Sequence, residues 1–162
     1  MNQSKEYFQN RPTKLFIGVA WVSLIIGAAL YLIGLWNVDT MQLNEKGFYL
    51  TVLLFALHSV VSVQKNVRDK IEGKEVNAVY EIITWVAVCA PVAFLIIGLY
   101  NANLLLSEKG FYGIAFFMSM FAAITIQKNT RDLAFFDKHY PKAEVEVDAD
   151  LVVEGGLLIE FV

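Results

Sequence analysis

Charged residues are scarce in this chain of 162 residues, and cysteine is nearly absent. Asp, Glu, Lys and Arg make up 18% of the sequence, whereas an ordinary soluble domain has roughly a quarter. The single Cys89 excludes a disulfide scaffold. A net charge of −3 argues against a basic nucleic-acid-binding protein. Apolar residues reach 57%, more than a small water-soluble protein can hide from solvent. The composition therefore indicates a membrane protein with no nucleic-acid partner.

Four long stretches contain no charged residue, namely residues 15–36, 47–63, 82–100 and 110–126. They are 17 to 22 residues long. Since a helix rises about 1.5 Å per residue, such lengths match a hydrocarbon core of about 30 Å. None of them shows the polar stripe that a helix in a soluble bundle presents to water. We therefore predict an all-α integral membrane protein with four transmembrane helices and the lipid bilayer as its partner.

The lysines and arginines outside these stretches predict the orientation of the chain. Eleven of the thirteen lie before the first span, between the second and third spans, or after the fourth. The two remaining connections contain only Lys46 and Lys109. Because basic flanks stay in the cytoplasm, we expect both termini and the middle connection there.

The sequence contains an internal repeat, whose two copies are offset by 63 or 64 residues. Residues 44–49 (NEKGFY) recur as residues 107–112 (SEKGFY), and residues 64–69 (QKNVRD) recur as residues 127–132 (QKNTRD). Each repeat reads as helix, short loop and helix. Two spans per repeat place both repeats in the membrane in the same direction. We therefore expect two parallel-repeat helical hairpins that pack as an up-down four-helix bundle.

These doubled motifs resemble the YiaA/YiaB two-helix-domain family of bacterial inner-membrane proteins, over about residues 15–132. The resemblance implies a two-helix repeat and residence in the inner membrane, and it brings no reaction, substrate or catalytic residue with it. The remainder is an acidic cytoplasmic tail, with seven acids against two bases. Its residues 144–151 alternate acidic and apolar side chains, which allows a strand hairpin or a partly ordered tail. The predicted division is a cytoplasmic N-terminal segment, first repeat, linker, second repeat and tail: 1–14, 15–70, 71–81, 82–132 and 133–162.

The two outer loops contain the first candidate site. Asn44 and Ser107 are residues that favour the N-cap of a helix, and the glutamate after each suits the positive end of the helix dipole. Asn37 and Asn101 follow the preceding spans, where Asn tolerates the left-handed turn that ends a helix. These structural roles explain the residues without a ligand. If the loops lie side by side, however, a shared outer site would consist of Asn37, Glu45, Asn101 and Glu108.

Basic residues near the cytoplasmic ends of the second and fourth helices form the other candidate site. The inside-positive bias, the helix dipole and neighbouring acids explain them already. With Lys70 and Lys74 they would also suit anionic lipid headgroups, at about 1 kcal/mol for each base. The candidates are Lys65, Arg68, Lys128 and Arg131.

His58 is the exception inside the spans, and its counterpart in the second repeat is Phe121. No carboxylate accompanies it in the membrane to build a proton relay, so we expect it to bond a neighbouring carbonyl or serine. The other histidine, His139, lies in the tail, so we expect no metal site and no cofactor. Cys89 is interpreted as a small apolar filler.

Small residues recur at three- and four-residue spacing in the first and fourth spans, which lets helices approach closely. They are Ala20, Ser23 and Gly27, and Ala115, Ser119 and Ala123. We expect these faces to pack within the bundle or between copies of the chain.

The sequence shows no nucleophile–base pair, paired membrane carboxylates, phosphate loop or metal cluster. We therefore expect no enzymatic activity and no catalytic residue. The favoured role is structural or interaction-based in the inner membrane, with association into a homo-oligomer. The alternative is a small-molecule transporter or channel subunit. Scarcity of intramembrane charge counts against transport of ions, but not of apolar solutes.

Overall fold

Four helices make up the computed structural model, which describes residues 11–139. They are α2 (Lys14–Trp36), α3 (Leu43–Ile71), α4 (Ala78–Asn101) and α5 (Leu106–His139). Each is long and apolar enough to cross a membrane. No strand occurs within residues 11–139. The predicted all-α membrane fold with four spans is therefore confirmed. The tail beyond residue 139, including residues 144–151, lies outside the described residues.

The second helix of each repeat is much longer than its charge-free core. α3 has 29 residues and α5 has 34, or roughly 44 and 51 Å at about 1.5 Å per residue. Both exceed a hydrocarbon core of about 30 Å. The excess lies toward the basic ends, and α5 continues through residues 133–139, which the sequence analysis assigned to the tail.

The connection between the repeats is short, and the helix on each side of it has a well-defined end. α3 ends before Gly73, which has the left-handed φ of +74° that glycine adopts readily. α4 begins after Asn77, whose Oδ1 accepts a hydrogen bond from the backbone N–H of Val79 at 2.9 Å. Only residues 72–77 therefore separate the two helices.

The described chain divides into a large unit, residues 18–127, and a smaller unit, in which residues 11–17 and 128–139 come together. In the smaller unit, Arg11 and Asp137 form an ion pair with 3.3 Å between the guanidinium nitrogen and the carboxylate oxygen. Thr13 Oγ1 accepts from the backbone N–H of Phe16 at 3.2 Å and so satisfies one amide at the start of α2.

The core of the large unit is aromatic at its centre. Tyr31 and Phe116 are fully buried, and their ring centroids lie 5.7 Å apart. The hydroxyl of Tyr31 donates to the backbone carbonyl of Tyr49 at 3.3 Å. Leu53 and Leu95 pack into the same cluster. One side chain from α2 thereby meets residues of α3 and α5.

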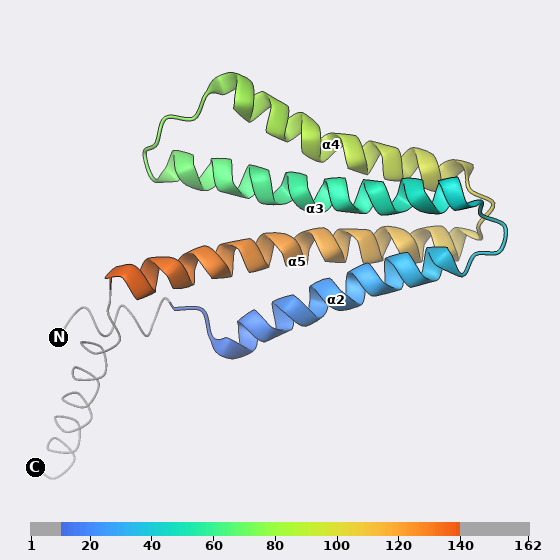
Figure 1. Cartoon of the computed structure of the whole chain (residues 1–162), viewed down its shortest axis with the longest axis horizontal. Coiled ribbons are helices and arrows are strands. Elements are labelled where there is room, and N and C mark those ends of the chain that lie inside the picture. Colours follow the sequence, from blue (N-terminus) through green and yellow to red (C-terminus); the bar gives the residue numbers. More distant parts are fainter. Residues whose placement is uncertain (1–10, 140–162) are drawn as a thin grey trace, which may run out of the picture. The chain divides into compact units, whose positions relative to one another are not determined.

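Close packing joins helices of different repeats. α3 runs beside α4 and α2 runs beside α5 in the large unit (Figure 1). A methyl group at Gly34 of α2 would lie 2.5 Å from Tyr112 Cε1 of α5. Equivalently, a methyl group at Gly98 of α4 would lie 3.2 Å from Tyr49 Cε1 of α3. Each repeat thus supplies a glycine that receives a tyrosine ring from the other repeat.

The small-residue face of α2 also packs as its spacing predicts. Gly27 meets α5 so closely that a methyl group there would lie 2.7 Å from Ser119 Oγ and 3.1 Å from the carbonyl oxygen of Ala115. Ser119 and Ala115 belong to the small-residue face of α5, and both are buried. The two faces therefore pack within one chain.

The outward faces of the helices suit lipid. Large aliphatic side chains point outward from α2 and α4, such as Ile25, Ile33 and Ile96, with about 60% of each exposed. Such a continuous apolar surface is rare on a water-soluble monomer. It is what a bilayer-embedded bundle requires.

Candidate functional site

The helices that leave the two outer loops begin in the same way. Glu45 Oε2 accepts from the backbone N–H of Gln42 at 2.7 Å, and Glu108 Oε2 accepts from that of Leu105 at 2.8 Å. Asn44 was predicted to be the N-cap of α3, but it is the second residue of that helix. Ser107 is likewise the second residue of α5. The prediction was wrong by two residues because the glutamate at the third helical position satisfies the amide that precedes the helix.

A lysine closes each outer loop. Lys46 Nζ donates to the carbonyl of Trp36 at 2.6 Å and lies 5.7 Å from the centre of its ring. Lys109 Nζ donates to the carbonyl of Tyr100 at 3.1 Å. Each ammonium thus neutralises the negative end of the preceding helix. Sequence patterning gave these lysines a role in orientation and did not predict these bonds. The signal that could have predicted the bonds is the recurrence of each lysine nine or ten residues after an aromatic residue.

The two loop asparagines do not adopt the expected left-handed turn. Within residues 11–139, no residue other than glycine has a positive φ. Asn101 is the last residue of α4, and its Nδ2 donates to the carbonyl of Ile97 at 2.8 Å. The backbone N–H of Asn37 donates to the backbone carbonyl of Ile33 at 3.1 Å. These prolonged helical bonds explain why no left-handed residue is needed.

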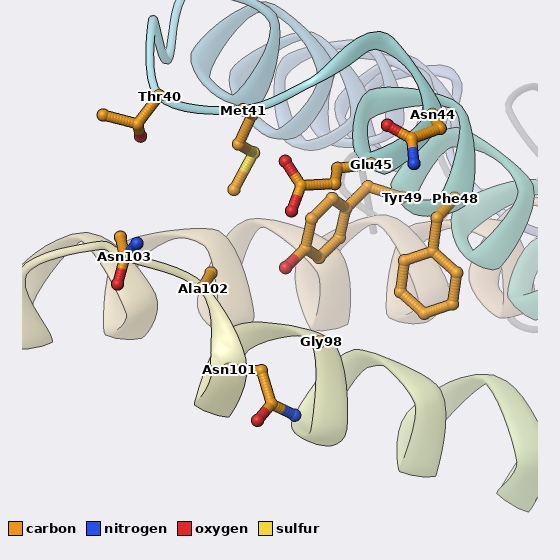
Figure 2. A pocket seen from close by; sticks show the side chains of 10 residues that line it. All are labelled: Thr40, Met41, Asn44, Glu45, Phe48, Tyr49, Gly98, Asn101, Ala102 and Asn103. Atoms are coloured by element: carbon orange, nitrogen blue, oxygen red, sulfur yellow. The ribbon is translucent and has the colours of Figure 1, made fainter.

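A pocket of about 290 Å³ lies between the start of α3 and the end of α4. It brings together Glu45 and Asn101, two of the four predicted outer-site residues, whereas Asn37 and Glu108 do not line it. Figure 2 shows the Glu45 carboxylate close to Met41 and the ring of Tyr49. The complete lining is Thr40, Met41, Asn44, Glu45, Phe48, Tyr49, Gly98, Asn101, Ala102 and Asn103.

The pocket combines one carboxylate with aromatic and amide groups. Among residues 11–139, no lysine or arginine forms an ion pair with Glu45. The rings of Phe48 and Tyr49 are 5.4 Å apart between centroids and inclined by 75°. The described residues contain no group of three or more His, Cys, Asp or Glu side chains placed to hold a metal. The groups present suit recognition of a small polar or cationic molecule.

His58 does not make the bond expected of it. Its side chain is exposed on α3, while neighbouring Ala56 and Ser59 face the core. Within the described chain its imidazole has no hydrogen-bond partner, and Ser62 Oγ instead donates to its backbone carbonyl at 2.9 Å. Cys89 is also exposed, so it does not fill the core as expected. The helical phase of α3 and of α4 turns both positions outward.

The basic candidates at the other end divide into two groups. Arg68 pairs with Glu72 at 3.0 Å, and Arg131 also has a partner. Lys65 and Lys128 are exposed, and neither forms an ion pair within residues 11–139. α5 continues to His139, so the predicted position of Lys128 and Arg131 at a helix C-terminus was wrong. The two lysines remain the better candidates for headgroups.

Two lysines at the connection between α3 and α4 pair with nearby carboxylates. Lys70 Nζ contacts both carboxylate oxygens of Glu81 at 2.7 and 2.8 Å. Lys74 Nζ contacts Glu72 at 2.7 Å and Asp69 at 3.3 Å. Hydrogen bonds to Glu72 and then to Asp69 raise the pKa of Lys74 above its ordinary value. Lys70 and Lys74 are therefore engaged within the protein, which counts against their predicted share in a lipid patch.

One buried polar contact near the linker distinguishes the repeats, and sequence reasoning missed it. Asn66 Nδ2 of α3 donates to Thr84 Oγ1 of α4 at 2.9 Å, and both residues are 5% exposed. At the equivalent positions the second repeat has Asn129 in place of Asn66, and the first repeat has Ala20 in place of Thr84. Asn129 is 2% exposed, and its Nδ2 has no partner within the described residues.

The duplication of the hairpin agrees with comparison to known sequences. The model of the yiaA/B two helix domain matches residues 16–69 and again residues 80–132. The chain belongs to this family. Its two matches coincide with the two repeats and include every residue that lines the pocket.

Two relatives place family members in membranes. The chain is 53% identical over 114 residues to Inner membrane protein YiaA of Escherichia coli (strain K12), covering 70% of this chain and 78% of that protein. It is 35% identical over 74 residues to Uncharacterized membrane protein YubF of Bacillus subtilis (strain 168), covering 46% of this chain and 85% of that protein. No solved structure matches. This YiaA/YiaB family member is therefore a multi-pass inner-membrane protein.

Proposed function

We propose that this protein is a non-enzymatic, self-associating component of the inner membrane, with both termini in the cytoplasm. The exposed imidazole of His58 carries the proposal. Ionisable residues in membrane helices almost always face the bundle interior, a cavity or a partner. His58 faces outward from α3, so a second copy of the chain is the proposed cover.

The surroundings of His58 support an interface. Thr51 and Lys65 are exposed one heptad before and one heptad after it, and Leu54 is exposed between them. Residues seven apart fall on one face of a helix. Polar side chains on such a face stabilise association in lipid by about 0.6 kcal/mol on average and up to about 1.7. The same face would bring His58 of two copies together around a twofold axis.

The interior supports a role other than transport or catalysis. Tyr31 and Phe116 fill the centre of the large unit. The buried polar residues of the described chain carry hydroxyl or amide groups and no acid, base or thiol: Ser59, Asn66, Thr84, Ser119 and Asn129. A closely packed core with such groups supports an interaction role over the alternative of a transporter or channel subunit.

The cytoplasmic placement of the termini rests on the distribution of basic residues. Eleven lysines and arginines lie on the side of the termini and of the linker, against two on the other side. Lys65 and Lys128 would then meet the anionic cytoplasmic leaflet. A reporter fused after Val162 should be detected on the cytoplasmic side of the membrane. Detection of the reporter from outside intact cells would contradict the cytoplasmic placement of the termini.

Self-association is tested by counting subunits of the full chain in lipid nanodiscs or by single-molecule photobleaching in liposomes. The decisive variant is His58→Phe, which installs the residue that the second repeat carries at this position. It should raise the dimer dissociation constant about three- to twentyfold, the range for a polar contact between membrane helices. Phe121→Leu, at the equivalent position of α5, is the matched control and should leave it unchanged.

Two results would contradict the proposal. One is a monomeric wild-type protein at the highest protein-to-lipid ratio, and the other is an equal effect of the two variants. Solute flux into proteoliposomes, tested with the same protein, would favour the transporter alternative.

A further inference from the structure

We propose that the pocket between α3 and α4 binds a small alkylammonium ion. This inference adds a ligand to the interaction role proposed above and does not depend on self-association. It rests on the juxtaposition of the Glu45 carboxylate, the aromatic corner of Phe48 and Tyr49, and the carboxyl-terminal end of α4.

The carboxylate supplies the charge. Glu45 is held in place by the bond from the N–H of Gln42 to its Oε2, and it has no ion pair within the described residues. The nearest lysine in sequence, Lys46, is directed instead to the carbonyl of Trp36. The pocket therefore holds a carboxylate that caps α3 and has no lysine or arginine partner within the described residues, and a bound cation would supply one.

The aromatic residues favour an organic cation over a bare metal ion. Phe48 and Tyr49 meet at 75°, so their rings form two walls of a corner. A ring face attracts an ammonium ion through its quadrupole, most effectively where water is displaced. Met41 adds an apolar, polarisable wall. Methyl or methylene groups next to the charge would contact these walls.

The end of α4 adds a side-chain acceptor, whereas its backbone carbonyls at Gly98 and Tyr100 are already bonded to Ala102 N–H and Lys109 Nζ. Asn101 uses its Nδ2 to bond Ile97, which leaves its Oδ1 as an acceptor. Gly98 lets the Phe48 ring approach α4 closely, because a methyl group there would lie 2.9 Å from Phe48 Cε1. The volume of about 290 Å³ is at the small end for ligand sites, which restricts the ligand to a small molecule.

The second repeat provides an internal control. Glu108 makes the same helix-capping bond as Glu45, and Phe111 has the place of Phe48 in the repeated motif. Neither residue lines this pocket. A change at either position in the first repeat can therefore be compared with the same change in the second.

The probe is choline, compared with its neutral isostere 3,3-dimethylbutan-1-ol, on the purified full chain in nanodiscs. Binding is measured by ligand-observed NMR titration. Wild type should bind choline at least about tenfold more tightly than the alcohol, because the alcohol lacks the charge that Glu45 attracts. Potassium chloride at matched ionic strength should not displace choline.

Matched substitutions test the residues. Glu45→Gln keeps an oxygen that can cap α3 but removes the charge, and it should weaken choline binding about tenfold. Phe48→Leu should weaken it about three- to tenfold. Glu108→Gln and Phe111→Leu should each change it less than about twofold. Circular dichroism melting of each variant verifies folding.

Each of four results would overturn the proposal: no choline binding to wild type, equal binding of choline and the alcohol, displacement by potassium, or equal effects of Glu45→Gln and Glu108→Gln. None of them bears on whether the protein dimerises, since subunit counting is done without choline.

Discussion

Removal of the Thr84 hydroxyl tests the contact that joins the repeats beside the linker. Thr84 Oγ1 accepts from Asn66 Nδ2 at 2.9 Å and donates to the carbonyl of Glu81 at 2.8 Å. Thr84→Ala leaves the Asn66 amide buried without this acceptor. The expected consequence is a less stable interface between α3 and α4.

The expected loss follows from two opposing considerations. A buried donor left without a partner costs about 1–3 kcal/mol. Hydrogen bonds between membrane helices contribute less, on average about 0.6 and at most about 1.7 kcal/mol, because the unfolded chain in a membrane also finds partners. Since Thr84 and Asn66 are both almost fully buried, we expect a loss of about 1–2 kcal/mol for Thr84→Ala.

The measurement is equilibrium unfolding in mixed micelles, followed by circular dichroism. Thr84→Ser is the control, because it keeps the hydroxyl and should lose less than half as much. A cycle with Asn66→Ala and the double variant isolates the pair, with an expected coupling of about 1 kcal/mol. Equal losses for Thr84→Ala and Thr84→Ser, or a coupling near zero, would refute this reasoning.

Two further predictions concern packing and charge. Gly27→Ala should destabilise the fold by about 1–3 kcal/mol, because the methyl group would press on Ser119; Gly18→Ala, with nothing within 4 Å, should not, and equal unfolding midpoints would contradict this packing. Because the pKa of Lys74 is raised above 10.5 through Glu72, its stabilising effect is complete below that pH and lost as pH rises through the folded pKa. Lys74→Gln should therefore melt below wild type at pH 8, and the gap should close above pH 10.5; a gap that persists at high pH would show that charge is not its cause.

Much of the fold could be predicted from the sequence, because lipid imposes simple requirements on a helix. The charge-free stretches fixed the number of spans, and the doubled motifs fixed their pairing into repeats. Helix ends were harder to locate. Capping preference assigned the start of α3 to Asn44, whereas Glu45 moves it to Leu43. The length of the helices at their basic ends was also underestimated, since α5 continues to His139.

The candidate site was predictable only in part. Glu45 and Asn101 meet at one pocket, as side-by-side loops required. Asn37 and Glu108 do not join them, because α3 pairs with α4 and α2 with α5. Spacing within the sequence says which residues share a helix face, but not which pair of helix ends encloses a cavity. Proteins of this kind therefore need a structure before a pocket can be assigned.

The reciprocal placement of Tyr49 on Gly98 and of Tyr112 on Gly34 means that neither half of the chain is complete by itself. A polypeptide limited to one half would carry both a tyrosine ring and a glycine, but it would lack the partner that each of them contacts in the full chain. Two such polypeptides could satisfy each other by exchange. The duplicated chain can thus be understood as an interlocked pair whose members are joined covalently through residues 72–77.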